Sequence, residues 1–198
     1  MQQFTLSTDR LVLDELRPPD AEAIYEYCQD PDFERYLTIP WPYRLGDAEY
    51  FITEFVPAGW ASGKELTWAL RDAAGEFLGV VGLRVKTDRY DIGYWLGSRH
   101  RGLGYMPEAV RAVIDWAFET GYAGIAEITW ECVAGNAAST AVARKLGFTF
   151  SGVGPALVAR RDGSHPESWH AVLRVEDDRS VKPGWPSASS ENEGAPTR

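Results

Sequence analysis

The chain has 198 residues, of which 44% are hydrophobic and 25% are charged, and this suits one globular domain with a buried core. Its formal net charge of −9 argues against a broad nucleic-acid-binding surface, which needs positive charge. No apolar run reaches the ~18 residues of a membrane span, and no signal-peptide pattern opens the chain, so we expect a protein that binds neither membrane nor nucleic acid. Cys28 and Cys132 are expected to be buried free thiols, which favours a cytoplasmic protein.

Residue patterns divide the first half of the chain into helices and strands. Pro18 and Pro19 stand where a first helical turn needs no backbone donor, so a helix begins there. A later proline-rich loop carries Trp41 and Tyr43. The elements expected are a strand over 10–16, a helix over 18–29, a helical turn up to residue 37, a helix over 47–62, and strands over 67–72 and 77–86.

The second half alternates strands with helices. The elements expected are a strand over 90–96, a helix over 105–120 ended by Gly121, a strand over 127–133, a short helix over 136–145, and strands over 148–153 and 169–175. From residue 177 the composition shifts to Pro, Gly, Ser and Glu, which predicts a domain over 1–176 and a disordered tail over 177–198. This order predicts an α+β fold built on one mixed sheet.

A basic, glycine-rich turn joins the strand over 90–96 to the helix that follows it. The first turn of a helix leaves its amides unpaired, so they can bind an anion. Gly102 and Gly104 have no Cβ, which lets a phosphate approach the main chain, and Arg99 and Arg101 add positive charge beside them. The turn therefore predicts a diphosphate site, with an ordinary strand–helix turn as the alternative.

Two common nucleotide motifs do not fit this turn. A Walker motif would need Gly-Lys-Ser/Thr, which is absent, and a Rossmann fingerprint would need a third glycine where Pro107 stands. A dinucleotide-binding module is therefore disfavoured. What is left is Arg-x-x-Gly-x-Gly, filled by Arg99, Gly102 and Gly104.

This pattern resembles the acetyl-coenzyme A loop of the GNAT superfamily of N-acyltransferases. A second segment resembles the same superfamily in order and spacing: Asn136 and Ser139 open a short helix that ends in Lys145-Leu146-Gly147-Phe148. Further segments resemble the branch that acetylates ribosomal-protein N-termini, namely 8–13, 39–42, 91–96 and 104–110. The resemblance covers roughly residues 8–175.

The resemblance implies a fold, a co-substrate and a set of binding residues. GNAT domains have a mixed, mostly antiparallel central sheet with helices on both faces, and coenzyme A inserts between two splayed parallel strands, here 90–96 and 127–133. Acetyl-CoA would be the co-substrate and an amine the acceptor, in a monomer or homodimer without a metal. The residues implied to bind the cofactor are Trp95, Leu96, Arg99, Arg101, Gly102, Leu103, Gly104, Tyr105, Asn136 and Ser139.

Ser139 is the candidate acid for the leaving group. Attack of an amine on a thioester gives a tetrahedral intermediate whose collapse expels a thiolate, and a hydroxyl beside the sulfur can donate to it. Many enzymes of the superfamily use a later tyrosine, but none lies between Ser139 and Phe148. Ser139 would otherwise be a plain polar residue of a first helical turn, and Asn136 is also a preferred helix N-cap.

The general base and the acceptor pocket are less well marked. Relatives in the ribosomal-protein branch carry a glutamate near the position of Val158 here, so Asp91 and Glu131 on the two splayed strands are the candidate catalytic carboxylates. Trp41 and Tyr43 lie in the segment that covers the acceptor in that branch. They would either wall the acceptor pocket or pack in the core.

These features predict an N-acyltransferase that moves an acetyl group from acetyl-CoA to a primary amine, on a protein N-terminus or a small molecule, by direct attack in a ternary complex. No covalent intermediate is implied, because Cys132, the one cysteine near the motifs, lacks an obvious histidine partner. His165 with Glu167 is a further candidate base, or an exposed loop histidine. A longer donor such as succinyl-CoA and a catalytically silent acyl-CoA sensor are the alternatives.

Overall fold

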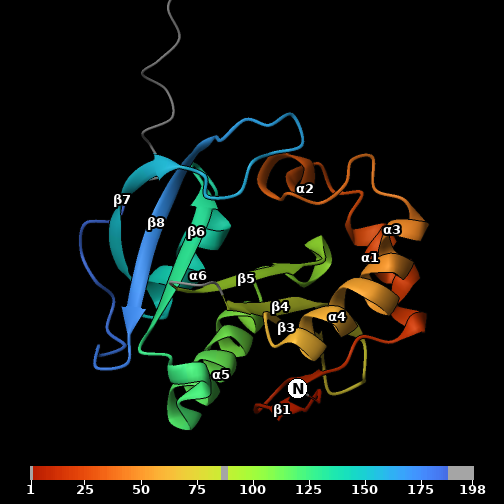
Figure 1. Cartoon of the computed structure of the whole chain (residues 1–198), viewed down its shortest axis with the longest axis horizontal. Coiled ribbons are helices and arrows are strands. Elements are labelled where there is room, and N and C mark those ends of the chain that lie inside the picture. Colours follow the sequence, from red (N-terminus) through yellow and green to blue (C-terminus); the bar gives the residue numbers. More distant parts are fainter. Residues whose placement is uncertain (1, 86–88, 187–198) are drawn as a thin grey trace, which may run out of the picture.

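The computed structural model describes residues 2–85 and 89–186. These residues form one eight-stranded sheet with helices packed against it (Figure 1). The strands are β1 (Leu6–Ser7), β2 (Val12–Asp14), β3 (Glu65–Arg71), β4 (Phe77–Val85), β5 (Tyr90–Leu96), β6 (Glu127–Val133), β7 (Thr149–Pro155) and β8 (Glu167–Arg174). They lie in the order β1-β2-β3-β4-β5-β6-β8-β7, and the β5–β6 pair is parallel in an otherwise antiparallel sheet. The expected α+β class with one mixed sheet is confirmed.

The helices flank this sheet. They are α1 (Ala21–Tyr27), α2 (Pro31–Tyr36), α3 (Leu45–Tyr50), α4 (Val56–Ser62), α5 (Tyr105–Thr120) and α6 (Ala137–Lys145). The long helix α5 packs against β4 and β5, and α4 packs against β3. Figure 1 shows α1, α3 and α4 gathered on the side away from β6, β7 and β8. None of the helices described is long and apolar enough to cross a membrane.

Two elements near the N-terminus differ from the sequence-based expectation. The strand expected over 10–16 is shorter in the structure, where it is β2. The Arg10 amide does not pair with a neighbouring strand, because it donates to the Glu108 carboxylate at 3.1 Å. The helix expected over 47–62 is interrupted by a π-helical turn, Phe51–Phe55. Pro57 follows in the first turn of α4 and has no amide to donate, which accounts for a break in the regular bonding there.

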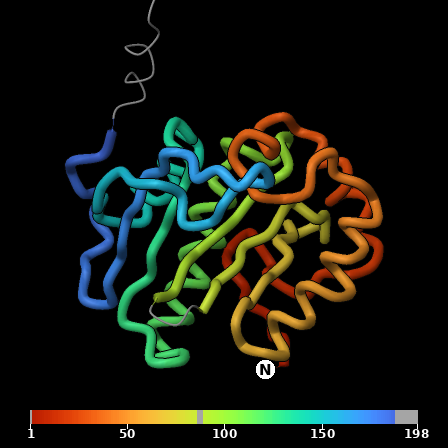
Figure 2. Tube along the Cα trace, turned by 45° about the horizontal axis from the view of Figure 1, so that its top comes forward, coloured from red at the N-terminus to blue at the C-terminus, as the bar shows by residue number. Residues whose placement is uncertain are grey.

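β5 and β6 meet at one end and then diverge. Their register consists of one pair, Asp91 with Thr129, whereas β4 and β5 pair along their length. Figure 2 shows the two strands separating from this point. Parallel neighbours need a crossover connection, and α5 supplies it while packing on β5. The splayed strands expected over 90–96 and 127–133 are confirmed.

The apolar face of α5 fixes this helix on the sheet, as its sequence predicts. Met106, Ala109, Val113 and Ala117 are all buried, at the spacing of one helical face. Gly121 ends the helix with a φ of 60°, in the left-handed region. The glycine-rich turn before α5 is therefore attached to a rigid element.

Residues 177–186 pack on the domain. Arg179 pairs with Asp115 of α5 at 3.1 Å, and the Trp185 ring lies 5.6 Å from the rings of Trp130 and Phe150. We propose that the domain extends past the expected boundary at residue 176, because one large aromatic ring buries enough apolar surface to hold a polar segment. Residues 187–198 of the expected tail lie outside the described residues.

Truncation after Glu176 should lower the melting temperature by roughly 3–8 °C, because it removes packing by Trp185 and the Arg179 ion pair, together worth about 1–3 kcal/mol. Truncation after Pro186 is the matched control and should change the melting temperature by less than about 1 °C. Calorimetry measures both. Equal melting temperatures for the two truncated proteins would show that residues 177–186 do not stabilise the domain.

Candidate active site

Two cavities adjoin between the splayed strands. The larger, of about 600 Å³, follows the first turns of α5 and α6 and the end of β5. The smaller, of about 170 Å³, lies among β5, β6 and the β7–β8 loop. Five residues line both cavities: Tyr36, Leu37, Tyr94, Asn136 and Ser139. A ligand in one cavity can therefore meet a ligand in the other beside these residues.

The glycine-rich turn forms one end of the larger cavity. Gly102 and Gly104 line it with φ values of 77° and 80°, which glycine adopts without strain. α5 begins at Tyr105, so the amides of its first turn have no intrahelical acceptor. Trp95 and Leu96, at the end of β5, line the same cavity. The structure thus brings together the predicted anion-binding turn and the edge of the open strand.

The two arginines of the turn have carboxylate partners. Arg101 lines the larger cavity and pairs with Asp30 at 2.8 Å and with Asp32 at 3.3 Å. Arg99 lines neither cavity, and its guanidinium pairs with Glu76 at 2.8 Å. Because these carboxylates offset the arginine charges, the backbone amides and the helix dipole become the main attraction for an anion here.

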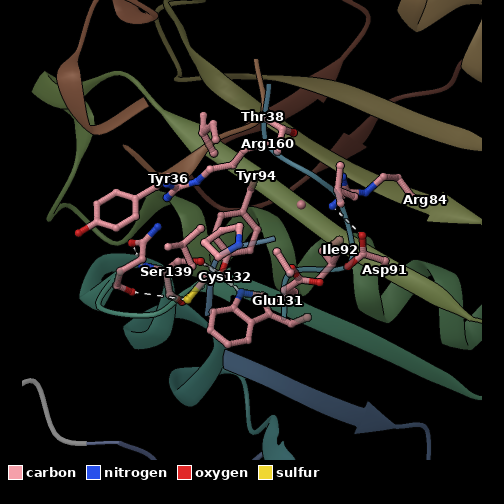
Figure 3. A pocket seen from close by; sticks show the side chains of 18 residues that line it. Tyr36, Thr38, Arg84, Asp91, Ile92, Tyr94, Glu131, Cys132, Ser139 and Arg160 are labelled. Carbon is pink, nitrogen blue, oxygen red and sulfur yellow. Dashed lines mark hydrogen bonds and ion pairs between the residues drawn. The ribbon is translucent and has the colours of Figure 1, made fainter. Parts of the chain in front are cut away.

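Three side chains from different elements meet where the cavities adjoin (Figure 3). Trp130 Nε1 on β6 donates to the Tyr94 hydroxyl on β5 at 2.9 Å and to Ser139 Oγ on α6 at 3.2 Å. Ser139 Oγ donates to the Tyr94 oxygen at 3.2 Å, and the Tyr94 hydroxyl donates to the Ser139 carbonyl at 3.1 Å. Sequence patterns did not indicate Tyr94 or Trp130. A tyrosine on the splayed strand itself is the signal that could have found Tyr94.

The first turn of α6 fixes the position of Ser139. Asn136 is the N-cap, as its sequence position predicts, and its Oδ1 accepts a hydrogen bond from the Ser139 amide at 3.1 Å. The buried Thr140 hydroxyl donates to the Asn136 carbonyl at 2.8 Å. Backbone and side chain therefore hold Ser139 Oγ toward the cavities without using its hydroxyl as a cap.

The site offers hydroxyl donors and no thiolate. Burial raises the pKa of Tyr94, and its hydrogen bonds with Ser139 and Trp130 oppose that shift, so Tyr94 is a neutral O–H donor at neutral pH. Burial also raises the pKa of Cys132, a lining residue of the smaller cavity, to about 12. Since the thiolate is the nucleophilic form of cysteine, Cys132 is poorly suited to covalent catalysis.

Both candidate carboxylates line the smaller cavity and are held by specific partners. Asp91 is buried and pairs with Arg84 at 2.6 Å. Glu131 accepts a hydrogen bond from the Leu157 amide at 3.0 Å. Figure 3 shows both carboxylates from the two splayed strands in the same wall region. Both carboxylates thus line the cavity that adjoins the predicted thioester site.

Four predicted site residues are not among the residues that line the two cavities. Leu103 is 54% exposed, and its carbonyl accepts from Arg10. Tyr43 is buried, and Trp41 precedes a cis proline in the same loop. These three residues and Arg99 line neither cavity. The position expected of Trp41 and Tyr43 is instead occupied by residues at the end of α2 and just after it, Tyr36, Leu37 and Thr38.

Comparison with protein families decides the assignment. A protein-family model described as acetyltransferase (GNAT) domain matches residues 10–149 of this chain. The chain belongs to the GNAT acetyltransferase family. Acetyl-CoA is the co-substrate of this family. No group of three or more His, Cys, Asp or Glu side chains that could hold a metal ion occurs among residues 2–85 and 89–186.

Individual relatives agree with this assignment. The chain is 31% identical over 121 residues to the uncharacterized N-acetyltransferase p20 of Bacillus licheniformis. The aligned region covers 58% of this chain and 66%, just under two thirds, of that protein. It is 28% identical over 152 residues to the uncharacterized N-acetyltransferase YoaA of Bacillus subtilis, covering 75% and 84%. In fold it is similar to RimL, a ribosomal L7/L12 alpha-N-protein acetyltransferase in complex with coenzyme A, with a TM-score of 0.75 and 18% identity over 88% of this chain and 100% of that one.

Gly104→Val should abolish tight coenzyme A binding, because a β-branched side chain at a φ of 80° strains the turn and occupies the space beside its amides. We expect affinity to fall at least about tenfold, which corresponds to ~1.4 kcal/mol. Gly121→Val is the matched control, since Gly121 has a φ of 60° at the other end of α5, away from the cavities. Calorimetric titration with coenzyme A measures both, and parental affinity in Gly104→Val would contradict the site.

Proposed function

We propose that this enzyme transfers the acetyl group of acetyl-CoA directly to a primary amine within a ternary complex. The observation that carries the proposal is the pair of adjoining cavities with Tyr94, Asn136 and Ser139 at their junction. Acetyl-CoA occupies the larger cavity, and the acceptor occupies the smaller one. The thioester carbon and the amine nitrogen meet at the junction, so no covalent carrier on the protein is required.

The larger cavity has the groups needed to bind coenzyme A. The diphosphate accepts hydrogen bonds from the amides of Gly102, Leu103, Gly104 and Tyr105 at the start of α5. Arg101 adds charge there. Arg99 supports the turn from behind, because its guanidinium pairs with Glu76 and lies 5.0 Å above the Tyr27 ring.

The pantetheine arm lies along the open edge of β5. β5 and β6 are paired only at Asp91 and Thr129, and beyond this pair the backbones of the two strands are not paired with each other. The amides of the pantetheine arm can therefore hydrogen-bond to the main chain of Trp95 and Leu96. The side-chain amide of Asn136 lines both cavities and lies farther along the same path.

Ser139 and Tyr94 stabilise the leaving group. Collapse of the tetrahedral intermediate breaks the carbon–sulfur bond and leaves negative charge on sulfur. The Ser139 hydroxyl, which donates to the Tyr94 oxygen at 3.2 Å in this structure, turns its hydrogen to that sulfur and donates a proton or a hydrogen bond, while Trp130 Nε1 still donates to Ser139 Oγ at 3.2 Å. The charge develops during the reaction, so these contacts act on the transition state.

Asp91 and Glu131 are the proposed proton acceptors for the attacking amine. Each carboxylate lines the smaller cavity, where the ammonium form of an acceptor arrives and must lose a proton before attack. Val158 lines the same cavity. Relatives that resemble this chain carry a glutamate near this position, whereas the residue here is apolar. The carboxylates of the splayed strands, or a water that they order, are therefore the proposed base.

Ser139→Ala should lower kcat by ~10–100-fold with little change in coenzyme A affinity, because the hydroxyl acts only as sulfur becomes charged. Tyr94→Phe should lower kcat by a smaller factor, and the double variant should be less impaired than the product of the two, because the two hydroxyls share one network. Tyr122→Phe, which removes a hydroxyl bonded to the Gly63 carbonyl, is the control. Unchanged kcat in Ser139→Ala would remove Ser139 from the reaction.

Replacement of the carboxylate that accepts the amine proton should lower kcat/KM by ~10²–10⁴-fold and flatten its rise with pH. Asp91→Asn and Glu131→Gln are to be compared over a pH series. Glu127→Gln is the control, since Glu127 is on β6 but pairs with Arg174 and lines neither cavity. If both cavity variants keep the parental pH profile, neither carboxylate is the base.

The assigned reaction is tested by release of free coenzyme A with a panel of amines and N-terminal peptides. Acetyl-CoA and succinyl-CoA run in parallel decide between the short donor and a longer one. Turnover with acetyl-CoA and an amine is the expected result. Tight binding of acetyl-CoA without turnover by any amine or peptide would instead identify a silent acyl-CoA sensor.

A further inference from the structure

The smaller cavity is lined by four charged side chains, and three of these have close partners. Arg84 and Asp91 form an ion pair at 2.6 Å. Glu131 accepts a hydrogen bond from the Leu157 amide at 3.0 Å. The fourth side chain, Arg160, has no carboxylate within 4.0 Å among the residues that the structure describes. Arg160 therefore forms no ion pair in the cavity wall, although its charge, after the hydrogen bonds from Ser164, helps to lower the pKa of Asp162, two residues away.

Arg160 is nevertheless held in place. Its Nη2 donates to the Arg35 carbonyl at 2.9 Å, and the neighbouring Arg161 donates to the Ile39 carbonyl. These two bonds tie the β7–β8 loop to the end of α2 and the segment after it, and Figure 1 shows that loop reaching α2. A guanidinium has five N–H donors, so the bond to one carbonyl positions Arg160 and leaves most of its donors available.

Other groups near Arg160 favour an anion beside it. The carboxylate of Asp162, two residues away, accepts the Ser164 amide at 2.9 Å and lies outside the cavity lining. The Nε of Arg84 is buried without a hydrogen-bond partner among the described residues. Thr38 lines the same cavity and offers a hydroxyl (Figure 3). Arg160 and Arg84 Nε therefore both have N–H groups available to an anion in this cavity.

We propose that the acceptor of this enzyme carries an anionic group, a carboxylate or a phosphate, besides its reactive amine, and that Arg160 binds this group. The inference rests on the proposed acetyl transfer and names the class of its acceptor. A planar guanidinium binds carboxylate or phosphate oxygens through two parallel hydrogen bonds. With the anion at Arg160, the amine points to the junction at Ser139 and Tyr94, where the carboxylates of Asp91 and Glu131 favour its positive charge before attack.

The same arrangement discriminates against other amines. A polyamine or an amino sugar with several ammonium groups would place a second positive charge against Arg160, and like charges in a partly desolvated cavity repel. A neutral amine would leave the Arg160 donors without the partner that orients the substrate. The acceptor is thus expected to be an amino acid, a phosphorylated amine or a peptide end with an acidic group close to its amine.

The test compares matched amines with acetyl-CoA as donor. Leucine is paired with leucinamide, and phosphoethanolamine with ethanolamine, so that only one member of each pair carries an anionic group. Comparing the two pairs shows whether the site prefers a carboxylate or a phosphate. The parent should prefer the anionic member of at least one pair by about tenfold or more in kcat/KM. Arg160→Gln, which keeps a donor for the Arg35 carbonyl, should abolish that preference through KM, while Arg161→Gln should retain it.

Each outcome decides between the acceptor class and the reaction. Equal use of anionic and neutral amines by the parent, or equal loss of preference in Arg160→Gln and Arg161→Gln, would overturn the role of Arg160 and leave acetyl transfer intact. If no amine releases coenzyme A, acetyl transfer fails, and calorimetric titration of the same four amines into the coenzyme A complex tests Arg160 alone. Binding of anionic and neutral members with equal affinity, or of none, would then overturn the inference.

Discussion

The organisation of this enzyme depends on one interruption in backbone pairing. β5 and β6 share a single registered pair, Asp91 with Thr129, in the middle of an eight-stranded sheet. Backbone donors and acceptors away from water need partners, so the open edges of the two strands favour a ligand that carries amide groups of its own. The crossover that parallel strands require brings α5 to the same opening. The interruption therefore produces both the groove and the anion-binding turn at its end.

The hydroxyl network spans this interruption. Tyr94 comes from one splayed strand, Trp130 from the other and Ser139 from the helix after it, and their hydrogen bonds link the three elements at 2.9–3.2 Å. Trp185 of the C-terminal segment packs on the far side of Trp130. The geometry of the proposed catalytic hydroxyls is thus coupled to the packing of residues 177–186.

The sequence allowed much of the coenzyme A side to be predicted, because its features are local. Glycines at a strand–helix junction, the N-cap Asn136 and the apolar face of α5 each depend on residues within a few positions of one another. The contacts of Tyr94 with Trp130, and of Arg101 with Asp30, join residues 36 and 71 positions apart. No periodicity or motif indicates such pairs, because they depend on how the strands splay and where α2 packs.

The acceptor side was harder to predict for the same reason. Its wall is assembled from the end of α2, from β4, β5 and β6, and from the β7–β8 loop. Trp41 and Tyr43 were predicted to line it from their place in the chain, but the chain enters the cavity at Tyr36, Leu37 and Thr38 instead. The proposed coenzyme A cavity thus depends on short sequence motifs, whereas the proposed acceptor cavity depends on packing between distant segments.

Hydrogen–deuterium exchange with and without saturating coenzyme A tests most directly whether the split between β5 and β6 is the cofactor site. Exchange reports whether a backbone amide has gained a hydrogen-bond partner. We predict slower exchange on binding in residues 94–96, 102–106 and 136–139, with no change in β7 or in β1. Protection absent from 94–96 and 102–106, or confined to another part of the sheet, would contradict the account.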